Sequence, residues 1–204
     1  MITKIRLQNW KSFKDSTIYI DSLGILIGTN ASGKSNVLDA FAFLRAVGEG
    51  KSLLDAIQTV RGGEDWIIRR GENTFCLELE VENEGSSYLL DLRVIRKDSV
   101  FSYGPCEIHR IGIGDDDVVP GKFMDSARNI LWKTYGVSES LDFWAKIYAT
   151  LRSIIILDPV PAKMRDYCKI SKELKSDGSN VAGVLCALSP EEKEKVEALV
   201  SSYV

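Results

Sequence analysis

The residues whose types and spacing point most directly to chemistry form a glycine-rich loop at positions 28–35. They read Gly-Thr-Asn-Ala-Ser-Gly-Lys-Ser and fit the pattern G-x-x-x-x-G-K-[ST], which is typical of phosphate-binding loops. In such a loop successive backbone N–H groups point inward and form a cradle for anionic oxygens, and the following helix adds its positive N-terminal dipole. The pattern therefore predicts binding of a nucleoside triphosphate, with ATP and Mg²⁺ as the expected ligands.

Two side chains of this loop have distinct expected roles. Lys34 is expected to reach the β- and γ-phosphates, and Ser35 to place its hydroxyl on Mg²⁺. The alternative is a glycine turn that caps a helix and binds nothing, but it leaves Lys34 opposed to the helix dipole with no anion to offset it. The residues expected to contact the nucleotide are Gly28, Asn30, Ala31, Ser32, Gly33, Lys34, Ser35 and Asn36, with Ser35 as the metal ligand.

Strand and helix patterns flank the loop on both sides, as a phosphate-binding loop requires. Alternation predicts strands at Ile2–Trp10 and Phe13–Ile20, joined by a turn at Lys11–Ser12. The short apolar run Gly24–Gly28 is bounded by glycines and predicts a buried central strand that leads into the loop. The residues from Lys34 to Val47 are apolar nearly all round, which predicts a buried helix after the loop.

The middle of the chain is typical of an antiparallel sheet. Thr74–Glu82 and Tyr88–Arg96 each alternate between apolar and polar residues, with turn-forming residues between them, so a β-hairpin is expected. The predicted inward faces are Phe75, Leu77, Leu79 and Val81, opposite Tyr88, Leu90, Leu92 and Val94. Phe101–Ile113 predicts a third strand, interrupted at Gly104–Pro105.

The C-terminal half is expected to be mainly helical. Gly114–Gly121 contains three consecutive aspartates and is interpreted as a solvated loop rather than a metal site. Ser189, Pro190 and Glu192 form a predicted capping box for the last helix. The other helices are expected at 52–60, 126–135, 139–151, 163–170 and 179–188, with a strand at 153–157.

Composition places the chain among ordinary globular proteins and limits its partners. It has 204 residues, 45% of them hydrophobic, and a formal net charge of -3, so whole-chain charge gives no support for nucleic-acid binding. Neither a signal peptide nor an apolar run long enough for a membrane span is present, so a cytoplasmic location is expected. The four cysteines and single histidine lack metal-ligand spacing, so reduced cysteines are expected.

The two ends of the chain resemble a known family. Residues 1–13, MITKIRLQNWKSF, followed by residues 28–36, GTNASGKSN, are similar to the N-terminus of the RecF/SMC-like ABC-type ATPases. In that group an N-terminal strand and an Asn-Phe-Lys/Arg-Ser-Phe-like turn precede a G-x-N-x-[SA]-G-K-S-N loop. Residues 174–182, LKSDGSNVA, resemble a stretch of the stand-alone predicted ATPases of this group, which are often found in bacterial defence loci.

The resemblance implies an α/β fold, namely a P-loop NTPase core of ABC-ATPase type beside an antiparallel β lobe. Residues 1–204 would be the N-terminal part of one such domain. Within it, 1–60 would begin the nucleotide-binding core, 65–113 would form the β lobe, and 126–204 would be mainly helical. The resemblance also implies that two ATP-bound heads form a homodimer, in which each offers a Ser-Gly-Gly-type signature to the other's γ-phosphate. It further implies a switch in DNA maintenance or phage defence, with DNA and a nuclease or other effector as partners.

Several parts of that hydrolytic machinery have no match in the sequence. The acidic pair that holds Mg²⁺ and orients water follows an apolar strand, but here Asp158 is followed by Pro159 and is interpreted as a chance match. No Leu-Ser-Gly-Gly-like signature is present, and the two glutamines, Gln8 and Gln58, come too early to sense a γ-phosphate. The chain is therefore interpreted as an N-terminal half whose catalytic residues are unassigned. Hydrolysis is expected only after completion by a second half with the acids, the signature and a switch histidine.

Two other classes of protein also carry a phosphate-binding loop of this kind. A transport-type ABC subunit would carry its glutamine loop and signature in a somewhat longer chain and would begin differently. A small P-loop kinase would have an arginine-rich lid and a base near the loop, whereas Asp39 is the sole early carboxylate and lies in the helix. The arginines of the first lobe could touch phosphate or DNA, although surface ion pairs are the simpler expectation for each of them. These are Arg45, Arg61, Arg69 and Arg70.

Overall fold

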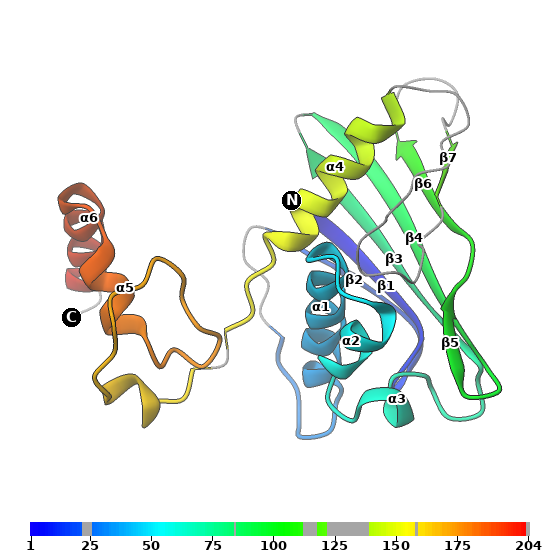
Figure 1. Ribbon diagram of the computed structural model, residues 1–204, viewed down its shortest axis with the longest axis horizontal. Coiled ribbons are helices and arrows are strands. Elements are labelled where there is room, and N and C mark those ends of the chain that lie inside the picture. The colour runs from blue at the N-terminus through cyan, green and yellow to red at the C-terminus, as the bar shows by residue number, and fades with distance from the viewer. Residues whose placement is uncertain (22–25, 84, 112–117, 122–138, 158, 203–204) are drawn as a thin grey trace. The chain divides into compact units, whose positions relative to one another are not determined.

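The computed structural model describes residues 1–21, 26–83, 85–111, 118–121, 139–157 and 159–202 (Figure 1). The chain divides into two compact units, residues 1–154 and 155–204, and each is described by itself. Within the part of the chain that the structure describes, no helix combines the length and the apolar character that crossing a lipid bilayer requires.

The described strands of the first unit form one antiparallel sheet in the order β2-β1-β3-β4-β6-β7, with β5 paired to β4 beside this path. The strands are β1 (Ile2–Trp10), β2 (Phe13–Tyr19), β3 (Thr74–Asn83), β4 (Ser86–Lys97), β5 (Val100–Tyr103), β6 (Cys106–Ile111) and β7 (Val118–Gly121). The predicted hairpin is β3–β4, and the predicted interruption at Gly104–Pro105 separates β5 from β6. The strand β7 lies in a segment that the sequence predicted as a loop.

Period-two patterning fixes which face of the sheet is buried. Leu77 of β3 pairs with Leu7 of β1 on one side and with Leu92 of β4 on the other, and all three are fully buried. Every residue predicted for the inward faces of the hairpin is buried, which confirms both the alternation and the register. Charged residues such as Glu78 and Glu80 point to the other face, where they form ion pairs with Lys4.

Helices pack on the apolar face of this sheet (Figure 1). They are α1 (Lys34–Gly48), α2 (Leu53–Gln58) and α4 (Glu139–Arg152), whereas the short α3 (Gly63–Trp66) contributes no buried residue. The rings of Trp10, Phe43 and Phe75 meet between α1 and the sheet, with centroids 5.0 to 5.8 Å apart. Further along α1, a Cβ built at Gly48 would lie 2.6 Å from the Cβ of Leu151, so glycine allows α1 and α4 to approach closely.

The second unit contains a long loop and two helices. A short 3₁₀ turn, Lys163–Arg165, precedes α5 (Val181–Ala187) and α6 (Pro190–Ser201). The buried amide of Asn180 fastens the loop, because it donates to the carbonyl of Glu173 and accepts from the N–H of Lys175, both at 2.8 Å. The predicted capping box is present: the Ser189 hydroxyl accepts from the Glu192 N–H, and the Glu192 carboxylate accepts from the Ser189 N–H.

Three elements expected from the sequence differ in the structure. The described part of the expected strand Gly24–Gly28 is not a strand, and Ile27 is 92% exposed. The expected strand at 153–157 is also absent, with Ile155 and Leu157 exposed. A short apolar run becomes a buried strand only where partner strands pair with it, and none of the described strands does so here. The helix expected at 163–170 is reduced to the 3₁₀ turn, since this segment lacks an apolar face to bury.

Some expectations concern residues outside those that the structure describes. These are the three aspartates Asp115, Asp116 and Asp117, the whole of the helix expected at 126–135, and Asp158.

Candidate functional site

The glycine-rich loop, residues 28–35, leads directly into α1. Its path needs left-handed backbone at Ala31, with φ of 66°, and at Gly33, with φ of 98°. Gly33 is the N-cap residue of α1, which begins at Lys34, and no side-chain hydrogen bond caps this helix end. An anion can therefore approach the first turn of α1 without displacing a capping group.

The side chain of Lys34 lies back across the loop. Its ammonium donates to the carbonyls of Gly28 and Thr29, both at 2.7 Å, and to the Ser32 hydroxyl at 3.3 Å. All three acceptors are uncharged oxygens. A phosphate oxygen would give the ammonium a charge-assisted and stronger bond, so Lys34 is poised to exchange loop carbonyls for an anionic ligand.

The two glycines of the pattern are sites of close approach. A Cβ at Gly28 would lie 2.7 Å from the Ser32 hydroxyl, and a Cβ at Gly33 would lie 2.8 Å from the ring of Phe13. A side chain at either place would push the loop out of its present curve. This tight curve and the uncapped end of α1 fit a phosphate group in the concave side of the loop.

The turn between β1 and β2 is attached to the first turn of α1. The Trp10 indole N–H donates to the carbonyl of Asn36 at 2.8 Å, and the Asn36 amide donates to the Ser12 hydroxyl at 2.8 Å. Asn36, which the sequence placed among the nucleotide contacts, thus uses its side chain to anchor the β1–β2 turn. Residues 10–13 consequently form one wall beside the loop.

A buried carboxylate lies one helical turn after Ser35. Asp39 is 5% exposed; it accepts from Lys11 Nζ, and from Arg61 Nε at 2.9 Å. Arg61 also donates through Nη2 to the Ser35 carbonyl at 2.7 Å. Sequence reasoning missed this network and treated Arg61 as a surface residue. The signal that could have shown it is a carboxylate among the apolar residues of a buried helix.

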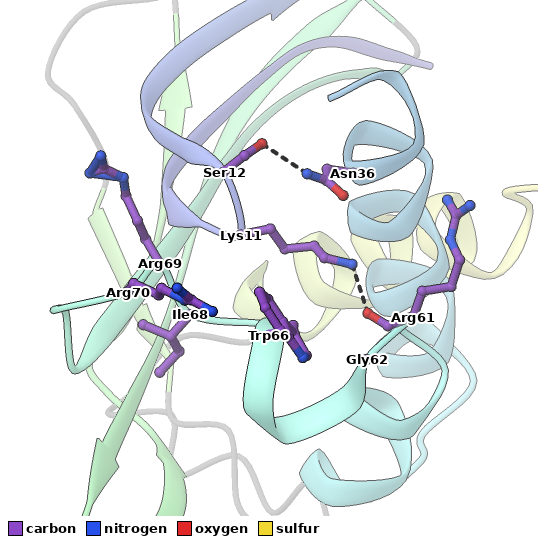
Figure 2. Close-up of a pocket in the computed structure, with 9 residues that line it drawn as sticks. All are labelled: Lys11, Ser12, Asn36, Arg61, Gly62, Trp66, Ile68, Arg69 and Arg70. Carbon is purple, nitrogen blue, oxygen red and sulfur yellow. Dashed lines mark hydrogen bonds between the residues drawn. The ribbon is translucent and has the colours of Figure 1, made fainter. Parts of the chain in front are cut away.

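A cavity of about 600 Å³ opens next to this network (Figure 2). It is lined by Lys11, Ser12, Asn36, Arg61, Gly62, Trp66, Ile68, Arg69 and Arg70. The indole of Trp66 is half exposed, and the Arg70 guanidinium lies over its ring at 4.9 Å. Basic groups together with an aromatic ring suit a ligand that combines negative charge with a flat ring system, as a nucleotide does.

Arg45 and Gln58, which the sequence analysis considered as phosphate contacts, do not line the cavity. Arg45 pairs with Glu49 along α1, as expected for a surface ion pair, and Gln58 donates to Glu64. No group of three or more metal-binding side chains occurs among the residues that the structure describes.

Comparisons with known proteins show the family to which this chain belongs. Residues 1–179 match the family described as "AAA ATPase domain". Three similar curated proteins each carry the name "DNA double-strand break repair Rad50 ATPase". The protein of Thermoplasma volcanium is 34% identical over 113 residues, which is 55% of this chain and 11% of that protein. The protein of Sulfolobus acidocaldarius is 26% identical over 175 residues, or 85% of this chain and 17% of that protein.

The third, from Thermoplasma acidophilum, is 31% identical over 98 residues, or 48% of this chain and 10% of that protein. The chain thus spans between about a tenth and a sixth of the length of the curated relatives that it matches. The match to the family covers most of the chain and includes the glycine-rich loop, the β1–β2 turn and the sheet that carries them. The chain belongs to the AAA ATPase domain family, within the RecF/SMC-like ABC-type ATPases.

Proposed function

We propose that the chain binds Mg-ATP through the glycine-rich loop and forms part of an ATPase head that acts as a nucleotide-driven switch. The observation that supports this most directly is the geometry of Lys34, whose ammonium is held by neutral carbonyls at the uncapped start of α1. The cavity is lined by Asn36, which follows the loop, but by none of residues 28–35, and it offers room and complementary groups for the rest of the nucleotide.

In this proposal the chain's own residues bind and orient rather than transfer protons. Backbone N–H groups of the loop cradle the phosphates, and Lys34 offsets their charge. Ser35 supplies one hydroxyl oxygen to Mg²⁺, which in turn would neutralise charge between the outer phosphates. The cavity beside Trp66 would receive the base and ribose, with the β1–β2 turn as a wall. Catalytic acids remain unassigned in this chain.

The exposed run Leu26–Gly28 supports the idea of a composite head. Leu26 and Ile27 are apolar and exposed immediately before the loop, where the sequence pattern predicts a buried strand. We propose that a further part of the head, with its acidic pair and signature, packs strands against this run. Homodimerisation on nucleotide binding, contact with DNA and a role in DNA maintenance or phage defence follow as proposals from the same family membership.

The binding proposal is tested by titrating the chain with ATP in the presence of Mg²⁺, using calorimetry. Replacing Lys34 by Ala removes a charge-assisted contact worth about 2–3 kcal/mol, so affinity should fall by roughly a hundredfold. Lys14→Ala is the matched control, because Lys14 is an exposed lysine on β2. Equal affinity of the Lys34→Ala variant and the control would contradict the proposal.

Turnover measurements test the composite head. The chain alone should bind ATP and hydrolyse it little, because the residues that orient the attacking water are proposed to lie elsewhere. Phosphate release in a coupled assay is the measurement. Robust hydrolysis that Asp158→Ala abolishes would contradict this and would make Asp158 a catalytic residue of the chain.

A further inference from the structure

Asp39 is a charged residue in a place where burial is costly. Its side chain is 7% exposed. Asp39 lies on α1, one helical turn after Ser35. A buried carboxylate is tolerated only when cations and hydrogen bonds compensate it. Lys11 and Arg61 do so, one on each carboxylate oxygen.

The two cations are held differently. The Lys11 side chain is 10% exposed, and its ammonium also donates to the Arg61 carbonyl at 2.8 Å. The Arg61 side chain is 60% exposed and runs alongside α1, where it reaches the carbonyl of Ser35 (Figure 2). One carboxylate thus faces two cations, of which the Arg61 guanidinium is the more exposed.

We propose that Asp39 is a positioning residue, which holds the Arg61 guanidinium against the first turn of α1 so that the site prefers a triphosphate over a diphosphate. This rests on the proposed binding of Mg-ATP. Arg61 donates to the carbonyl of Ser35, the residue that is expected to hold Mg²⁺ and that follows the phosphate-binding Lys34. A fixed cation at this place favours the ligand with more charge there, by about tenfold for one charge across a partly screened gap.

Asp39 matters in this scheme because an arginine side chain is long and flexible. Without the carboxylate, the Arg61 guanidinium would keep one contact to α1, and it would lose rotamer freedom when it acts on a ligand. With the carboxylate, that freedom is already lost before the ligand arrives. The pair therefore pre-organises the charge that the phosphates meet.

A purely structural role makes a different prediction. In that case the pair only ties the segment between α2 and α3 to α1, and its loss would lower the fraction of competent protein. Apparent affinities for ATP and ADP would then fall by the same factor, because each scales with that fraction. The ratio of the two affinities separates a positioning role from a structural one.

The experiment measures the affinities of the full chain for Mg-ATP and Mg-ADP in four forms: unchanged, Asp39→Asn, Arg61→Gln and the double variant. Each single change should lower the ATP-to-ADP ratio about tenfold, and the double change should lower it no further, since both act through one group. Arg45→Gln is the control, because this arginine of α1 pairs with Glu49 rather than with Asp39. The ratio of ATP affinity to ADP affinity in Arg45→Gln should equal that of the unchanged chain.

An unchanged ratio in either single variant would overturn the inference. If Asp39→Asn does not fold, Arg61→Gln decides alone, because it leaves the Lys11–Asp39 contact in place. Lys34→Ala separates the two proposals. If the unchanged chain binds neither nucleotide, the proposed function fails; if it binds both through Lys34 and the ratio does not move, only the role of Asp39 fails.

Discussion

The position and the burial of several charged side chains depend on the groups to which they are directly hydrogen-bonded. Lys34 is the clearest case, since its position depends on carbonyls of its own loop. Asp39 is another, since its burial depends on two cations. On the opposite face of the sheet, burial together with Asp91, whose carboxylate oxygen lies 2.9 Å from the sulfur, raises the pKa of the Cys76 thiol to about 12.

The raised pKa of Cys76 predicts low reactivity. The thiolate is the reactive form, so at pH 8 Cys76 should react with a thiol reagent far more slowly than the exposed Cys186. Mass spectrometry after timed alkylation measures both sites in one sample. Urea should abolish the difference, and rapid labelling of Cys76 in the folded chain would contradict the assignment.

The Cys76 thiol also makes the free energy of unfolding depend on pH. Its pKa in the folded chain, about 12, lies above the ordinary value of 9.0, so folding favours the neutral form. This contribution is fully present below pH 9 and is lost as the pH rises toward 12. Urea unfolding of the chain and of Cys76→Ala at pH 8 and pH 10 should show a steeper loss for the unchanged chain. Equal losses would contradict this.

At the scale of elements, the first unit depends on close packing of α1 against the sheet and against α4. The Trp10, Phe43 and Phe75 rings fill the space toward the sheet, and Gly48 allows α4 to come near. The α1 helix carries both the start of the proposed phosphate site and this packing. Its orientation therefore links the core to the loop.

Gly48→Ala tests this close approach. Alanine is the better helix former by about 1 kcal/mol, so propensity alone predicts stabilisation. The added Cβ would meet Leu151 and the Arg152 backbone N–H at 2.6 and 2.8 Å, and overpacking of this kind costs about 1–3 kcal/mol. We expect a net loss of stability in urea unfolding. Leu38→Ala is the control at an exposed site of the same helix, and a gain in the Gly48 variant would contradict close packing.

The second unit offers a parallel test at Gly183 of α5. A Cβ there would lie 2.1 Å from the carbonyl of Lys169, which is backbone and cannot swing away. Gly183→Ala should therefore loosen the loop that Asn180 fastens. Faster amide exchange confined to residues 155–202 would be the expected result. Unchanged exchange there would show that the backbone accommodates the methyl group without cost.

At the scale of the whole molecule, the sequence predicts most strongly those features that repeat locally. The hairpin faces, α1 and the capping box of α6 follow from period-two alternation, an all-round apolar helix and end-capping residues. The contacts of Asp39 are not predictable in this way, because Lys11 and Arg61 lie 28 and 22 residues away along the chain. The runs at 24–28 and 153–157 are apolar enough for strands, but the sequence does not show whether neighbours are available to pair with them.

Under the composite-head proposal, the exposed residues Leu26 and Ile27 would make the lifetime of the chain in a cell depend on its assembly. Extended apolar segments are what holdase chaperones and proteases bind, and triage of such surfaces changes how long a protein persists. A chain whose run is covered by its proposed partner strands would escape this surveillance, and one whose run stays open would not. The steady-state amount of the chain would then follow the supply of whatever covers residues 26–28, so that abundance is set by assembly.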